Sequence, residues 1–150
     1  MVSRTTEAAT LTNAVNAAAN DRSRPDVIVE VLFDRGLFQI SIKNIGDLPA
    51  IGVSIKFDKK IVGLGGSKEI SALPLFRNIE FFGPGREIVT LLDTSYSYFA
   101  RKQPTKISAR ITYSDSAKNK YEMSINHDLE IYRELTYLPA IEHDLDCCKQ

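Results

Sequence analysis

The segment Gly36-Leu-Phe-Gln-Ile-Ser-Ile-Lys-Asn44 decides the fold class of this chain, together with Ala50-Ile-Gly-Val-Ser-Ile-Lys-Phe-Asp58, which follows after a short turn. Apolar and polar residues alternate in both segments, and we expect Phe38, Ile40 and Ile42 on one face of the first. A period of two is typical of a strand with one buried and one solvated face. Two such strands joined by a turn predict an antiparallel sheet that meets water on one side.

Composition narrows the classes of function. The chain has 150 residues, of which 43% are hydrophobic, and this fits a single folded domain. Nineteen basic residues balance nineteen acidic ones, so the net charge gives no electrostatic reason to expect nucleic acid, for which basic residues supply most of the affinity. We therefore expect no nucleic-acid partner.

The sequence also bears on export, membrane insertion and disulfide crosslinks. No apolar run approaches the ~20 residues of a spanning helix, and no secretory signal is recognisable. The cysteines are the adjacent pair Cys147 and Cys148, so no disulfide crosses the core. These features predict a cytoplasmic protein without a membrane span.

Strand-like segments recur at regular spacing after Pro25, separated by turns rich in Gly, Pro, Asn and Asp. This pattern predicts an all-β, immunoglobulin-like Greek-key β-sandwich of about seven strands. Gly83-Pro-Gly85 suits a type II turn. The expected strands cover residues 27–33, 36–44, 50–58, 76–82, 87–92, 106–113 and 121–125, the last with an extension over 128–132.

Three regions follow from the changes in composition. Residues 1–24 are rich in Ala, Thr and Asn and form either a short helix or a disordered lead-in. Residues 25–136 form the sandwich. Residues 137–150 form a polar tail.

A family resemblance rests on Ile42-Lys-Asn-Ile-Gly-Asp-Leu-Pro-Ala-Ile-Gly-Val-Ser-Ile-Lys-Phe57. This segment resembles the strand B, turn and strand C of bacterial and archaeal immunoglobulin-like sandwiches of the CARDB kind. The resemblance covers roughly residues 25–133. It implies an accessory or adhesion-related module, commonly exported or membrane-attached, so an extracytoplasmic or membrane-tethered location is the alternative to the cytoplasm. The family has no catalytic set to carry over.

The connection Tyr96-Ser-Tyr-Phe-Ala-Arg-Lys102 combines aromatic and basic side chains, which are enriched at the energetic centres of protein interfaces. It is the candidate interaction loop. The alternative is that its rings cap one end of the sandwich, as a tyrosine in this connection often does. The candidate site residues are Tyr96, Tyr98, Phe99, Arg101 and Lys102.

Other motifs point to no cofactor, metal or catalytic site. Gly63-Leu-Gly-Gly-Ser-Lys68 has neither the Gly-Lys-Ser/Thr order nor the third glycine of nucleotide-binding loops. Glu142-His-Asp-Leu-Asp-Cys-Cys148 gathers metal-ligand types, but adjacent cysteines fit a tetrahedral site poorly. The chain also lacks a Gly-x-Ser-x-Gly nucleophile motif.

These observations favour a non-catalytic module for protein–protein interaction or structural support. We expect either an unknown protein partner or self-association through a sheet edge. The alternative is small-molecule or lipid binding, in the interior of the sandwich or at one of its ends.

Overall fold

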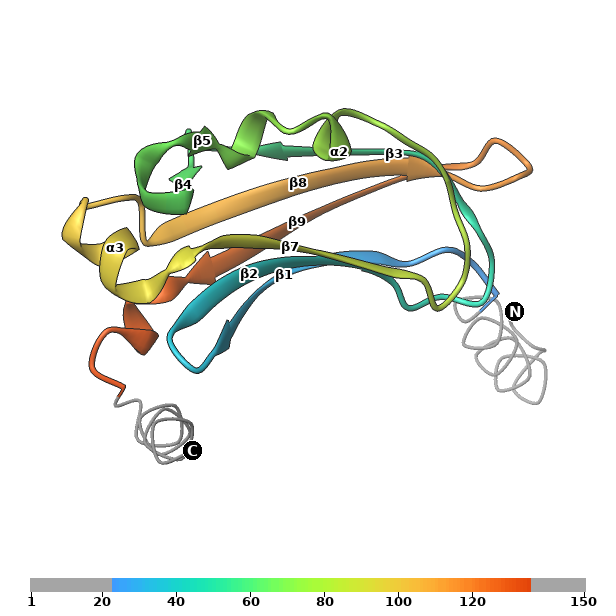
Figure 1. Cartoon of the computed structure of the whole chain (residues 1–150). Helices are drawn as coiled ribbons and strands as arrows, with labels where there is room; N and C mark the ends of the chain where they lie inside the picture. Colours follow the sequence, from blue (N-terminus) through green and yellow to red (C-terminus); the bar gives the residue numbers. More distant parts are fainter. Residues whose placement is uncertain (1–22, 136–150) are drawn as a thin grey trace, which may run out of the picture.

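Two antiparallel sheets face each other in the computed structural model, which describes residues 23–135 (Figure 1). The all-β sandwich predicted from the alternating segments is therefore confirmed. The predicted lead-in, up to residue 22, and the predicted polar tail lie outside the described residues. The Greek-key and immunoglobulin-like descriptions stay predictions.

The first sheet has three strands in the order β1-β2-β7, and the second has four in the order β6-β3-β8-β9. A separate two-stranded ribbon, β4 and β5, brings the described residues to nine strands, two more than predicted. The strands are β1 (Val27–Asp34), β2 (Leu37–Asn44), β3 (Ala50–Phe57), β4 (Val62–Gly63), β5 (Lys68–Glu69), β6 (Ile79–Phe82), β7 (Glu87–Thr94), β8 (Lys106–Ser114) and β9 (Lys120–Asp128). Short helices connect them: η1 (Leu64–Gly66), η2 (Ile70–Ala72), α2 (Pro74–Arg77), α3 (Ser95–Ala100) and η3 (Leu129–Tyr132).

The core lies between the two sheets and is built from the alternate residues of their strands. Phe38, Ile40 and Ile42 are buried as the pattern predicted. The facing sheet contributes every second residue of β8, and helical segments add Phe76 and Tyr98. Burial of these side chains supplies the main stabilisation, at about 25 cal/mol per Å² of apolar surface removed from water.

Two expected strand segments are wrong. The pattern predicts Phe76 in a strand, but it lies in α2, because Pro74 occupies a first-turn position that a helix tolerates well. The expected extension of the last strand ends at Asp128, whose side chain accepts a hydrogen bond from the Glu130 amide at 3.0 Å. This contact begins η3 in place of further strand.

The turn before β7 has the predicted geometry. Gly85 has a φ of 78°, and the Arg86 amide donates to the Gly83 carbonyl oxygen at 3.2 Å. A positive φ at the third position of a turn that begins Gly-Pro is the requirement of type II.

Side-chain bonds close the edge of the sandwich where β1 lies beside β9. The Val29 carbonyl oxygen lies 2.8 Å from Nε2 of His127, and the Val27 amide donates to the Tyr113 hydroxyl at 3.3 Å. Both contacts join residues of different sheets, so this edge of β1 is occupied.

Within residues 23–135, no helix combines the length and the apolar character that crossing a membrane requires.

Candidate functional site

The candidate loop lies at one end of the sandwich, where α3 and η3 come together (Figure 1). An open hollow of about 360 Å³ lies between α3 and the residues that directly follow η3. Its lining, which we call the α3–η3 surface, is Tyr96, Phe99, Ala100, Arg133 and Leu135.

Helix α3 forms because Thr94 caps it. The Ser97 amide donates to Oγ1 of Thr94 at 3.1 Å, which satisfies one of the free amides of the first turn. Just before the cap, β7 shifts register against β2, so that Gln39 pairs with Leu91 while Phe38 pairs with Asp93. Such a bulge changes the side to which the next side chain points, and it explains why the Asp93 carboxylate is buried.

Tyr98 fixes the helix to the core. Its side chain is fully buried, and its ring lies edge-on to Phe38 at a centroid distance of 5.6 Å. The hydroxyl donates to the Pro104 carbonyl oxygen at 2.5 Å. Burial raises the pKa of Tyr98 well above its ordinary value, so the phenol stays protonated and keeps its donor role.

Arg101 joins the helix to the β4–η1 segment. Its guanidinium pairs with the Asp93 carboxylate and donates to the Val62 carbonyl oxygen at 3.0 Å. The other carboxylate oxygen of Asp93 accepts from the amides of Gly65 and Thr94, at 3.2 and 2.8 Å. The Arg101 guanidinium and the Asp93 carboxylate are therefore both bonded within the molecule.

Phe99 and Arg133 contact each other within the lining of the hollow. The Arg133 guanidinium lies 4.2 Å from the centroid of the Phe99 ring, a cation–π arrangement. Glu130 holds the guanidinium with two of its oxygens, one of them at 3.1 Å from a terminal nitrogen. This hydrogen bonding raises the pKa of Arg133 and lowers that of Glu130. Underneath, the Phe99 ring lies edge-on to Phe38 at 5.6 Å.

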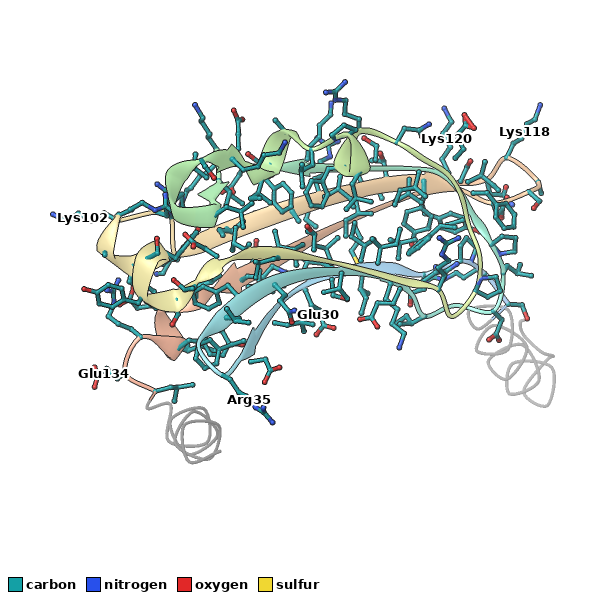
Figure 2. The ribbon with its side chains drawn as sticks, viewed as in Figure 1. Glu30, Arg35, Lys102, Lys118, Lys120 and Glu134 are labelled. Carbon is teal, nitrogen blue, oxygen red and sulfur yellow. The ribbon has the colours of Figure 1, made fainter. Side chains whose placement is uncertain are left out.

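Two further side chains of the loop face solvent. Tyr96 is 82% exposed, although tyrosine is a residue that usually buries most of its ring. Lys102 extends away from the sandwich at the α3 end, far from Lys118 and Lys120 at the opposite end (Figure 2).

The five residues named from sequence thus divide between two roles. Tyr98 and Arg101 are engaged with the core and with β4–η1, whereas Tyr96, Phe99 and Lys102 lie at or near the surface. Sequence reasoning missed Glu130, Arg133 and Leu135, which complete the surface from the other side. The one usable signal was the i, i+3 spacing of Glu130 and Arg133, which favours an ion pair on a helical turn.

The arrangement suits contact with another surface. The described part of the chain holds no group of three or more His, Cys, Asp or Glu side chains placed to bind a metal ion. His143, Cys147 and Cys148 lie outside the described residues. The α3–η3 surface brings together the exposed ring of Tyr96, the Phe99 ring under the Arg133 guanidinium, and the aliphatic side chains of Ala100 and Leu135.

Comparison with known proteins identifies the family of this chain. A family model described as "Domain of unknown function (DUF8453)" matches residues 2–133. The search of curated proteins found no match.

Proposed function

Because this chain belongs to the DUF8453 family, whose description gives no activity, we propose a function from geometry: a non-catalytic module that binds a protein partner through the α3–η3 surface. The observation that carries the proposal is the fixed pair of Phe99 and Arg133 beside the exposed ring of Tyr96. Tyr, Phe and Arg are enriched in the cores of interfaces, and here all three side chains lie in the lining of one hollow.

Pre-organisation supports the same proposal. Association costs free energy when flexible side chains become ordered at an interface. Here Glu130 already holds the Arg133 guanidinium, and Phe38 already supports the Phe99 ring. A partner that placed an apolar side chain in the hollow would therefore meet a surface that needs little rearrangement.

The alternative, a small-molecule or lipid site inside the sandwich, has less support. The space between the sheets is filled by side chains that pack as one core, among them Phe38, Phe82 and Tyr98. The hollows at β3, β8 and β9 are open and are lined by more polar and charged residues than apolar ones.

We also propose kinship with immunoglobulin-like sandwiches of the CARDB kind. The strand order supports it, because three strands in the order β1-β2-β7 face four in the order β6-β3-β8-β9. We propose a cytoplasmic location, with an extracytoplasmic or membrane-tethered location as the alternative that this kinship implies.

Photo-crosslinking tests the proposed surface. A photoreactive phenylalanine analogue at Tyr96 should capture one specific protein from a lysate of the source organism, whereas the same analogue at Lys118 should not. Excess unmodified chain should compete, but excess Ala100→Arg variant should not, because the added side chain fills the hollow. Equal capture at both positions, or equal competition by the variant, would contradict the proposal.

A further inference from the structure

We propose that β7 forms an antiparallel pair with β7 of a second copy of this chain, through residues 87–91. This interaction uses a different surface from α3–η3 and does not depend on the function proposed above. Two three-stranded sheets would then become one six-stranded sheet across a two-fold axis.

The outer edge of β7 is open over its first five residues. β7 is the last strand of its sheet, so in the described residues no strand pairs with this side. Its last residues are covered by the β4–η1 segment: a Cβ added to Gly63 would lie 2.0 Å from the Leu92 carbonyl oxygen, and the Gly65 amide donates to Asp93. The open stretch is therefore Glu87-Ile-Val-Thr-Leu91.

This stretch has the composition of a strand that pairs readily. Ile, Val and Thr favour strands, and the stretch contains neither proline nor lysine, the residues that commonly protect a free edge. Val89 and Leu91 are 45% and 42% exposed, so an apolar surface accompanies the unpaired backbone. The one charged residue, Glu87, is bonded within its own sheet: its carboxylate accepts a hydrogen bond from the Ser41 hydroxyl on the neighbouring strand at 2.6 Å.

The remaining edges differ from β7 in ways that hinder pairing. β1 is bonded to the facing sheet through His127 of β9 and Tyr113 of β8, as described above, and β9 carries the charged residues Lys120 and Glu122. β6 has four residues, carries Glu80, and is followed by Pro84 after one residue. Short, charged or covered edges are the usual means by which proteins avoid association.

The stretch is complementary to itself about its midpoint. A two-fold axis at Val89 places Val89 opposite its own copy, Glu87 opposite Leu91, and Ile88 opposite Thr90. No like charges face each other, and all five open residues take part. An axis at Thr90 would instead place Glu87 opposite Asp93 and would use residues that β4–η1 already covers. Two-fold dimers are also the commonest symmetric assemblies.

Site-specific disulfides test this register in the full chain carrying Cys147→Ser and Cys148→Ser. Residues directly opposite in an antiparallel pair have Cα atoms ~4.5–5.5 Å apart, within the range that a disulfide spans. Val89→Cys should therefore give a disulfide-linked dimer on mild oxidation. Leu91→Cys is the matched control, because its copies would lie roughly 13 Å apart at ~3.3 Å per residue.

We expect the Val89→Cys dimer to form at least about tenfold faster than the Leu91→Cys dimer, given the narrow distance range of the bond. Sedimentation equilibrium of the chain with native cysteines, kept reduced, should show a reversible dimer that Val89→Lys abolishes, while the unfolding curve of the variant matches that of the parent chain at a concentration where the parent is monomeric. Equal oxidation rates in the two variants, or a chain that stays monomeric at all concentrations measured, would overturn the proposal.

Discussion

The side-chain amide of Asn44 donates a hydrogen bond to the carbonyl oxygen of Phe82 at 3.0 Å, joining the end of β2 in one sheet to the end of β6 in the other. Asn44 is fully buried, and its amide also donates to the Leu48 carbonyl oxygen at 2.9 Å. Its side-chain oxygen accepts from the amides of Asp26 and Gly46. One side chain thus satisfies backbone groups where the chain crosses between the layers.

Replacing Asn44 should therefore destabilise the fold strongly. Asn44→Ala leaves two carbonyl oxygens, of which that of Phe82 is buried, and two amides without these partners, and we expect a loss of about 3 kcal/mol in the free energy of unfolding. Urea denaturation measures it. Asn126→Ala, at an exposed position of β9, is the control and should stay within about 0.5 kcal/mol of the parent chain. A similar small change at Asn44 would show that water replaces its bonds.

Gly46 is required by close packing against the segment that precedes β1. A Cβ added there would lie 2.1 Å from the Arg24 carbonyl oxygen, so Gly46→Ala must displace backbone. We expect a loss of about 2 kcal/mol, in the range of other overpacked sites. Gly83→Ala is the control, since its Cβ would meet a side-chain atom of Phe81 at an ordinary 3.7 Å. Equal thermal midpoints for the two variants would contradict this account.

The Asp93–Arg101 pair should behave as a buried ion pair. Asp93→Ala leaves the guanidinium of Arg101, whose side chain is 24% exposed, without its carboxylate, and we expect a loss of about 3 kcal/mol. The double variant Asp93→Ala/Arg101→Leu should lose less than the sum of the single variants, because the unpaired charge is gone. Glu122→Ala, which breaks the exposed pair with Arg110, should change the unfolding curve little. Additive losses at 93 and 101 would show that the two groups are uncoupled.

Stability should fall in alkali through the buried tyrosines. Burial raises the pKa of Tyr98 in the folded chain above the ordinary value of 10.0, and it also raises the pKa of Tyr113. The folded state therefore keeps protons that the unfolded state releases, so the free energy of unfolding decreases as the pH rises above about 10.

Tyr98→Phe separates this effect from simple loss of packing. The variant should lose about 1 kcal/mol at neutral pH with the hydrogen bond to Pro104, and its stability should then decline less between about pH 9 and 11 than that of the parent chain. Tyr96→Phe, at the exposed end of the loop, should follow the parent curve. Parallel curves for Tyr98→Phe and the parent chain would contradict the role of burial.

The sequence predicted the sandwich because alternation is a local property. Residues such as Ile40 and Ile111 repeat with period two, and burial of one face follows wherever a second layer exists. The local pattern gave a wrong prediction near Phe76. The apolar residues there resemble a strand, but Pro74 begins a turn of helix. The capped helix at Thr94 was also readable in principle, but aromatic residues favour strand and loop alike.

The candidate site could be predicted only in part, because its second half comes from a distant segment. Phe99 and Arg133 are 34 positions apart, and nothing in the composition around Arg133 indicates that it covers a ring. The burial of Asp93 depends on a bulge in β7 that changes the side of one residue, and a period of two places that residue outside. Such contacts depend on register and on chain crossings between layers, which a single sequence does not specify.

The affinity of the captured partner for two matched variants tests the central claim most directly. Ala100→Arg fills the hollow of the α3–η3 surface, whereas Ala117→Arg adds the same side chain at an exposed position of the β8–β9 hairpin at the opposite end. Isothermal titration should show a Kd at least about tenfold weaker for Ala100→Arg, a loss of roughly 1.4 kcal/mol, and no change for Ala117→Arg, with equal unfolding free energies for both. Equal Kd values for the two variants would contradict the claim that this chain binds its partner through α3 and η3.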